Sequence, residues 1–243
     1  MSTAPKVTAP VAKNADNDRS ALWRGLWLLI LVVAVFAVSY KYFGIGKIKT
    51  NPRLANLEKS LQDIRAAMNV DSVRQYNIQK IMSIINRYNP AMPSGTKYEI
   101  ADEIYNLSIK YTNLDVDLIC ATITNESGGT WEPEVVSETE AMGLMQVMPV
   151  TSVWIAHYEG ITWVSPEEVL FNPIYNIRIG CRQLSTYIKM YELEGGLAAY
   201  NGGEKRAAIW LKNNKAKGIL WAETSSYIPH ILKLYDEYKA ITL

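Results

Sequence analysis

The chain has 243 residues, enough for one domain of ordinary size with appendages. Its 25 Lys and Arg nearly balance its 24 Asp and Glu, so no bulk charge points to nucleic acid or to an acidic partner. The 15 Tyr and 7 Trp, against 3 Phe, suit carbohydrate clefts and membrane interfaces as well as ordinary cores. Cys120 and Cys181 lie far apart without metal-like spacing, so we expect two buried thiols or, less readily, one disulfide in an exported domain.

The N-terminal region has two parts. Residues 1–21 show no apolar periodicity and are predicted to be a disordered tail. Residues 22–43 are predicted to form a transmembrane anchor, with a cleaved signal peptide as the alternative. The uncharged stretch 25–40 would be about 24 Å long as a helix, which is short for a hydrocarbon core of about 30 Å. Flanking aromatic residues, together with snorkelling Arg24 and Lys41, are expected to supply the missing length.

Residues 44–96 are predicted to be a helical linker or an extra helical layer of the core. Apolar residues in the first part are spaced alternately by three and four: Leu54, Leu57, Leu61, Ile64 and Met68. This stripe covers two heptads, too few to indicate a coiled-coil oligomer. Residues 97–243 read as short helices separated by Gly, Pro and Asn turns, so the predicted fold class is mainly α.

The segment from Asp115 to Gly129 contains the most conspicuous acid. Asp115 is predicted to cap the start of a helix and Gly128 to end it. The buried stripe of this helix is expected to consist of Leu118, Ile119, Thr122 and Ile123. Glu126 falls about 20° from Ile119 at 100° per residue, so it lies on that stripe and at the helix C-terminus. Burial and the helix dipole both raise the pKa of such a carboxyl, unless Glu126 points to water or pairs with a Lys.

Six short motifs occur in order in this part of the chain. They are Glu126-Ser127, Pro133–Ser137 (PEVVS), Gly143–Pro149 (GLMQVMP), Asn172–Gly180 (NPIYNIRIG), Ala198–Gly203 (AAYNGG) and Glu223–Tyr227 (ETSSY). Together they resemble the family 1 lytic transglycosylases, the catalytic domain of soluble lytic transglycosylase, which is related to goose-type lysozyme. Two departures are visible: Glu140 stands where the family usually has Gly, and Trp221-Ala222 replaces the usual Leu-Pro.

The resemblance implies a lysozyme-like domain over residues 97–243 and a reaction with one catalytic carboxyl group. Glu126 would first donate a proton to the β-1,4 bond between N-acetylmuramic acid and N-acetylglucosamine. The substrate's own N-acetyl group would stabilise the positive centre. Glu126 would then act as base on the sugar's 6-hydroxyl, which gives a 1,6-anhydro product. No cofactor and no metal are expected.

The resemblance also implies a set of substrate-binding residues: Ser127, Met145, Gln146, Tyr200, Asn201 and Glu223. Plainer roles compete with these. Ser127 would cap a helix end, Tyr200 and Asn201 would end a helix before a Gly-Gly turn, and Glu223 would support the cleft wall.

Two other functions remain open from the sequence. A hydrolytic muramidase of the inverting type would need a second carboxylate about 6.5–9.5 Å from the first. Candidates for it are Glu134, Glu138, Glu140 and Glu223. A non-catalytic wall-binding assembly protein is the third possibility.

The expected partner is the peptidoglycan glycan strand, not nucleic acid. The expected location is the inner membrane, with a single pass and the catalytic domain on the periplasmic side; a virion-associated membrane protein is the alternative. The Lys and Arg counts on the two sides of the span are tied, so charge does not orient it. Wall remodelling, secretion-system assembly and phage entry are all compatible settings.

Overall fold

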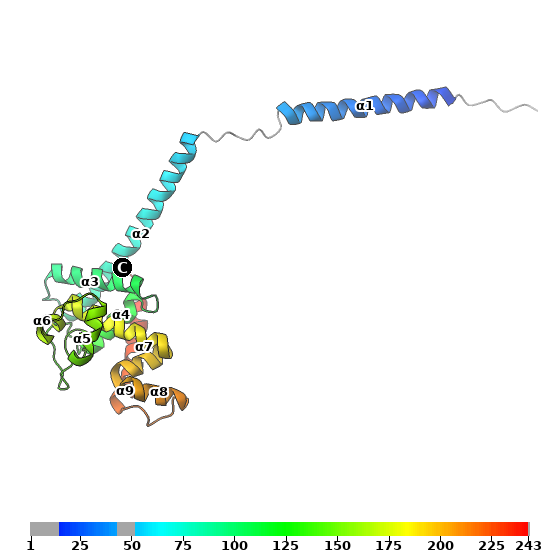
Figure 1. Cartoon of the computed structure of the whole chain (residues 1–243). Coiled ribbons are helices and arrows are strands. Elements are labelled where there is room, and N and C mark those ends of the chain that lie inside the picture. The colour runs from blue at the N-terminus through cyan, green and yellow to red at the C-terminus, as the bar shows by residue number, and fades with distance from the viewer. Residues whose placement is uncertain (1–14, 43–51, 243) are drawn as a thin grey trace, which may run out of the picture. The chain divides into compact units, whose positions relative to one another are not determined.

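The computed structural model describes residues 15–42 and 52–242, and helices dominate this part of the chain (Figure 1). The described helices are α1 (Ala15–Tyr42), α2 (Pro52–Tyr88), α3 (Ser94–Lys110), α4 (Val116–Glu126), α5 (Pro149–Tyr158), α6 (Pro166–Leu170), α7 (Pro173–Gly202), α8 (Glu204–Lys212) and α9 (Ala222–Lys239). Extended pairing within the described residues is limited to isolated bridges, such as Val136 with Met142. The predicted mainly α class is confirmed.

The chain divides into two compact units, Met1–Ala66 and Ala67–Leu243. Helix α1 in the first unit begins at Ala15, so the last residues of the predicted disordered tail are helical; residues 1–14 lie outside the described part. The transmembrane span predicted over residues 22–43 is not found. Within the described residues, no helix is long and apolar enough to cross a membrane. The uncharged stretch within α1 is short for that task.

Helix α2 is one continuous helix whose two halves have different environments. Apolar side chains of its first half, including Leu57 and Leu61, are exposed. Those of its last turns are buried in the hydrophobic core of the second unit: Ile78, Ile81, Ile84 and Ile85. The apolar repeat thus runs through both halves, and the last turns form an extra layer of the core. The compact unit accordingly starts at Ala67, ahead of residue 97.

Helix α4 lies within the second unit, where it packs against α3 and α9, while α7 packs against α3, α5, α6, α8 and α9. A buried polar chain ties three elements together. The Thr124 hydroxyl accepts a hydrogen bond from the Trp131 indole at 2.9 Å and is hydrogen-bonded to the Tyr238 hydroxyl at 2.9 Å. Tyr238 in turn donates to the Tyr88 hydroxyl of α2 at 2.9 Å. Because these groups satisfy one another, α2, α4 and α9 are held in one arrangement.

Both cysteines are buried free thiols, as favoured from the sequence. The Cys181 Sγ lies 3.8 Å from the Met145 Sδ. Burial raises the pKa of the Cys120 and Cys181 thiols, so neither is poised as a thiolate.

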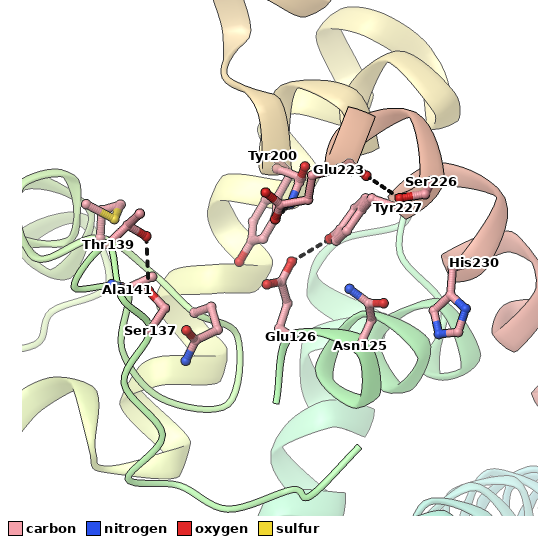
Figure 2. A pocket seen from close by; sticks show the side chains of 13 residues that line it. Asn125, Glu126, Ser137, Thr139, Ala141, Tyr200, Glu223, Ser226, Tyr227 and His230 are labelled. Carbon is pink, nitrogen blue, oxygen red and sulfur yellow. Dashed lines mark hydrogen bonds between the residues drawn. The ribbon is translucent and has the colours of Figure 1, made fainter. Parts of the chain in front are cut away.

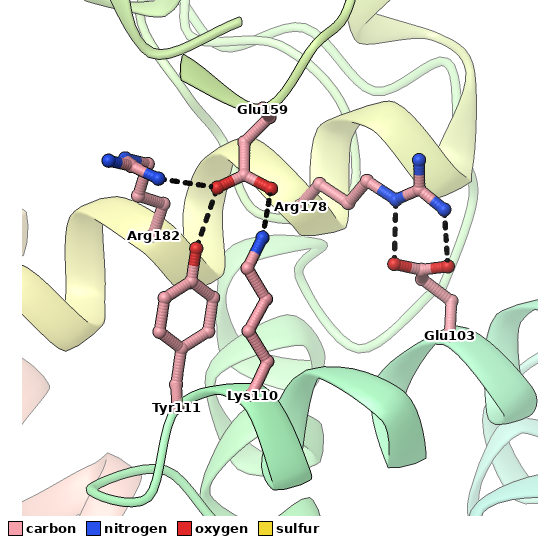
Figure 3. A network of polar contacts seen from close by, with 6 residues as sticks. All are labelled: Glu103, Lys110, Tyr111, Glu159, Arg178 and Arg182. Carbon is pink, nitrogen blue, oxygen red and sulfur yellow. Dashed lines mark hydrogen bonds and ion pairs between the residues drawn. The ribbon is translucent and has the colours of Figure 1, made fainter.

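The Glu159 carboxylate, at the C-terminal end of α5, joins three helices (Figure 3). It accepts hydrogen bonds from the Tyr111 hydroxyl at 2.7 Å and from Arg182 Nη1 at 2.9 Å, and Lys110 Nζ lies 2.6 Å from its other oxygen. Its side chain is only 2% exposed. Burial by itself raises the pKa of Glu159, but these three donors outweigh it, so the pKa lies below the ordinary value of 4.5.

We expect Glu159→Gln to lower the free energy of unfolding by about 2 kcal/mol at pH 7, because charged partners lose their carboxylate. The folded-state pKa is depressed, so this stabilisation is present above pH 4.5 and is lost as the pH falls through the folded pKa. Urea unfolding at pH 7 and at pH 3 measures both effects. The exposed Glu167→Gln is the control, and equal stability of the two variants at pH 7 would contradict the prediction.

Candidate active site

Helix α4 is built as its sequence indicates. The Asp115 carboxylate accepts a hydrogen bond from the Leu118 N–H at 2.8 Å, and Glu126 is the last helical residue. Gly128 follows with φ of +62°, a conformation that glycine adopts without strain. The predicted cap and end of the helix are confirmed. The four residues of the predicted stripe are buried, but so is every other residue from 116 to 124, since the helix is enclosed by its neighbours.

A cleft of about 640 Å³ opens at the C-terminal end of α4 (Figure 2). It is lined by Asn125, Glu126, Ser137, Thr139, Ala141, Gln146, Met148, Tyr200, Asn201, Glu223, Ser226, Tyr227 and His230. These residues come from the end of α4, the loop before α5, the end of α7 and the first half of α9. In the described part of the chain, no three or more His, Cys, Asp or Glu side chains form a group that could hold a metal ion.

The Glu126 carboxyl faces the cleft and has one hydrogen-bond donor in it. The Tyr227 hydroxyl, from α9, donates to Glu126 Oε1 at 2.6 Å (Figure 2). Burial raises the pKa of Glu126 to about 7; the Tyr227 hydrogen bond opposes this rise, and the negative charge of Glu223 adds to it. A carboxyl group in this state carries its proton in a substantial fraction of molecules at neutral pH, which is the property of a general acid.

Four of the predicted substrate-binding residues line the cleft together with Glu126. The Gln146 amide donates to backbone carbonyls of its own loop, at 2.8 Å in the case of Gly143, so its orientation is set. The Tyr200 hydroxyl donates to the carbonyl of Met145 at 2.8 Å. In the view of Figure 2, the Tyr200 and Glu223 side chains are drawn above and to the left of the Tyr227–Glu126 hydrogen bond. The fourth residue, Asn201, has its amide nitrogen 3.4 Å from a Glu223 carboxylate oxygen.

Ser127 and Met145, also predicted as substrate contacts, do not line the cleft. Ser127 is 2% exposed, and its hydroxyl accepts a hydrogen bond from the Trp131 N–H at 3.0 Å, which orders the turn after α4. Met145 is 0% exposed and packs against Gly180 and Cys181. Both side chains are therefore buried beneath residues that line the cleft. Neighbouring side chains along a chain point in different directions, so Glu126 and Gln146 can face the cleft while Ser127 and Met145 do not.

Tyr227 is a site residue that was not predicted from the sequence. Its signal was available, since Tyr227 closes the ETSSY motif, which was recognised without a role for this hydroxyl. Other cleft residues that were not predicted lie within the quoted motifs (Ser137, Met148 and Ser226) or outside them (Asn125, Thr139, Ala141 and His230). Only the packing of α9 against α4 and α7 brings Ser226 and His230 to the cleft.

Two motifs are joined by a buried asparagine. The Asn176 amide donates to the carbonyls of Met142 at 2.8 Å and Leu170 at 2.9 Å, and its oxygen accepts from the Met145 N–H at 2.8 Å. Gly143 has φ of +78°, and a Cβ there would lie 2.1 Å from the Asn176 amide nitrogen. Any side chain at Gly143 would thus displace this amide. The Asn176 amide thus links the GLMQ and NPxxN motifs in space.

Glu140 occupies a backbone conformation that suits glycine, with φ of +67°. This is the position at which the resembled family usually has Gly. We expect Glu140→Gly to raise the free energy of unfolding by up to about 1 kcal/mol, because relief of the left-handed strain exceeds the added entropy of the unfolded chain. Glu140→Ala is the matched control, since it removes the carboxylate but keeps the strain. An equal gain from both variants in urea unfolding would contradict the prediction.

Comparison with known proteins finds a family model and curated relatives that match this part of the chain. The family model of the Transglycosylase SLT domain matches residues 105–220. A putative soluble lytic murein transglycosylase of Haemophilus influenzae is 30% identical over 149 residues, which cover 57% of this chain and 24% of the relative. The soluble lytic murein transglycosylase of Escherichia coli K12 is 32% identical over 118 residues, 44% of this chain and 18% of the relative.

Among solved structures, an inactive mutant of the lytic transglycosylase Slt from Pseudomonas aeruginosa is similar with a TM-score of 0.49 and 26% identity. The match covers 56% of this chain and 23% of that one. The chain thus spans about a quarter or less of the length of the curated relatives it matches. Residues 105–220 thus match the Transglycosylase SLT domain, and the curated relatives of this region are named as soluble lytic murein transglycosylases.

Proposed function

We propose that this protein cleaves the glycan strands of peptidoglycan between N-acetylmuramic acid and N-acetylglucosamine and leaves a 1,6-anhydro end. The observation that carries the proposal is the Glu126 carboxyl, which lies in a cleft of about 640 Å³ with its pKa raised to about 7. A protonated carboxyl group in such a cleft can protonate the leaving oxygen of a glycosidic bond. The curated relatives in this family are named as murein transglycosylases.

In the first step Glu126 donates its proton to the bridging oxygen, and the bond from that oxygen to the anomeric carbon breaks. The Tyr227 hydroxyl, 2.6 Å from Glu126 Oε1, keeps the carboxyl oriented and stabilises the carboxylate that is left. The substrate's N-acetyl oxygen stabilises the positive anomeric carbon. This assignment leaves the second carboxylate in the cleft, Glu223, without a covalent role.

In the second step the Glu126 carboxylate takes the proton of the sugar's 6-hydroxyl, and that oxygen bonds to the anomeric carbon. Holding the hydroxyl beside the carbon replaces a bimolecular encounter by an intramolecular one. The Asn201 side-chain oxygen is buried and has no hydrogen-bond partner within the described residues. We assign it to the N–H of a substrate N-acetyl group, which would supply the missing donor.

Mass analysis of digested peptidoglycan tests the reaction. Transglycosylation gives anhydro ends, 18 Da lighter than the reducing ends that hydrolysis by a muramidase would leave. Reducing ends would overturn the anhydro product, and the absence of any soluble fragment would favour a non-catalytic wall-binding protein.

The substrate lies outside the cytoplasmic membrane, so we place the SLT domain on the periplasmic side, in wall remodelling, secretion-system assembly or phage entry. A periplasm-active reporter fused after Leu243 tests this location.

We expect Tyr227→Phe to reduce the rate about tenfold and to move the alkaline limb of the pH–rate profile to higher pH. The hydroxyl stabilises the ionised carboxyl, so its removal raises the pKa of Glu126 further and keeps the acid protonated at higher pH. Glu223→Gln is the matched variant, and it should move the alkaline limb to lower pH, because it removes a negative charge that raises the pKa of Glu126. Initial rates from pH 5 to 9 measure both. Alkaline limbs at the same pH in the two variants would contradict the assignment of Glu126 as the general acid tuned by Tyr227 and Glu223.

A further inference from the structure

Helix α5 turns an apolar face outward. Val150, Val153, Trp154 and Tyr158, here called the α5 face, are 77%, 40%, 72% and 68% exposed. Their spacing of three, one and four places them on one side of the helix. A surface helix ordinarily presents polar side chains to water, and a contiguous exposed apolar patch marks a binding surface.

Trp154 stands between two hollows. The larger, of about 720 Å³, is bounded on one side by α5 and on the other by the loop Gly160–Trp163. Trp163 is partly buried against the hydrophobic core, so its position is held while Trp154 projects into solvent. The smaller hollow, of about 300 Å³, lies on the α7 side of Trp154. Arg182 in that smaller hollow is already paired with Glu159. The larger hollow offers the indole rings of Trp154 and Trp163 together with the imidazole of His157.

The charge of this part of the chain restricts the occupant. Residues 131–177 contain seven Glu and no Lys or Arg. Arg182, which lies 5.1 Å from the centre of the Tyr158 ring, is paired with Glu159, so it does not offer a free cation of the kind that anionic lipid and nucleic acid need. Tryptophan and tyrosine combine an apolar ring with a polar handle, which suits a ligand that has both apolar C–H faces and hydroxyl or amide groups. A saccharide with uncharged N-acetylated sugar rings has this chemistry.

Helix α5, which carries the α5 face, starts beside the Glu126 cleft. Met148 lines the cleft, and α5 begins at the next residue. Trp154 lies six residues beyond Met148, about 9 Å along the helix. We propose that the α5 face and its larger hollow form a second saccharide-binding site, which holds the glycan strand outside the cleft. The proposal rests on the proposed function, because it takes the occupant to be the same polymer that Glu126 cleaves.

Binding to purified peptidoglycan sacculi tests the site in the full chain that carries Glu126→Gln, which prevents turnover. In co-sedimentation we expect Trp154→Ala and Trp154→Leu each to raise the Kd about tenfold, and Trp154→Tyr to leave it within about twofold. The Leu variant keeps apolar area but has no ring to stack on a sugar, so it is the matched control. Because Trp154 is exposed, the thermal midpoint should stay the same. Equally tight binding by the Leu and Tyr variants overturns the proposal.

A second measurement identifies the occupant. The Glu126→Gln chain is labelled with 5-fluorotryptophan, and the Trp154 resonance is assigned by its loss in Trp154→Tyr. A neutral N-acetylglucosamine hexamer should shift the Trp154 and Trp163 resonances and leave that of Trp221 in place. A shift with anionic phospholipid vesicles but not with the hexamer overturns the proposal. If the α5 face binds the hexamer while the wild-type chain releases no fragments from sacculi, the proposed cleavage reaction is wrong and the second saccharide-binding site still stands.

Discussion

Replacing Glu126 by Gln is expected to lower the release of soluble fragments from sacculi by about 10³-fold or more, because the amide can neither donate the proton nor take one back. The effect should appear in the maximal rate at saturating substrate, since the shape of the cleft is preserved. Glu138→Gln is the control: this exposed acid lies close in sequence but does not line the cleft. Fragment release by Glu126→Gln at the rate of Glu138→Gln would remove Glu126 from the mechanism.

The same substitution is expected to change stability in a pH-dependent way. The pKa of Glu126 is about 7 in the folded chain and 4.5 ordinarily, so the unfolded chain releases its proton at lower pH. Wild-type stability therefore falls as the pH rises from about 4.5 to about 7. The Gln variant lacks this loss and should be the more stable protein above pH 7, with the difference vanishing below pH 4.5. Thermal midpoints at pH 4.5 and 8 measure it, and a variant less stable than wild type at pH 8 would contradict the burial argument.

Asn176→Ala is expected to produce the largest loss of stability among the changes considered, about 4 kcal/mol. It leaves three buried backbone groups without their partner, those of Met142, Met145 and Leu170. Each unsatisfied group costs about 1–3 kcal/mol. The loop that carries Gln146 into the cleft should loosen as well, so fragment release should fall at temperatures where the variant is still folded.

Urea unfolding of Asn176→Ala measures the loss directly. Asn213→Ala is the control, because the Asn213 amide makes one exposed hydrogen bond, to the Ile209 carbonyl at 2.7 Å. We expect less than about 1 kcal/mol from that change. A loss of similar size in the two variants would mean that the Asn176 hydrogen bonds are replaced by water, and that the two motifs are not held together by this amide.

Much of the acid's immediate setting could be predicted from the sequence. Asp115 as the cap, Glu126 near the helix end and Gly128 beyond it follow from local chemistry, since capping and left-handed turns depend on residue type within a few positions. The environment of α4 was predicted less well. A stripe was expected, and the helix is enclosed on all sides, because burial depends on how many other elements pack around it.

The neighbours of Glu126 were predicted only in part. Gln146 and Tyr200 line the cleft, whereas Ser127 and Met145 turn away from it. A motif points to chemistry in a segment but does not give the direction of each side chain, and Ser127 and Met145 both lie in turns, where the local backbone conformation sets that direction. Tyr227 lies 101 positions from Glu126, and only the packing of α9 on α4 brings its hydroxyl to the carboxyl.

The sequence by itself determined that this chain is mainly α, that it carries an SLT domain and that Glu126 is the candidate acid, since periodicity, caps and motifs are properties of short segments. Only the tertiary structure decided that the pKa of this acid rises to about 7, because burial by distant helices and the charge of Glu223 raise it against the opposing hydrogen bond from Tyr227. It also decided that the outward face of α5 is apolar, since exposure is a property of the assembled fold.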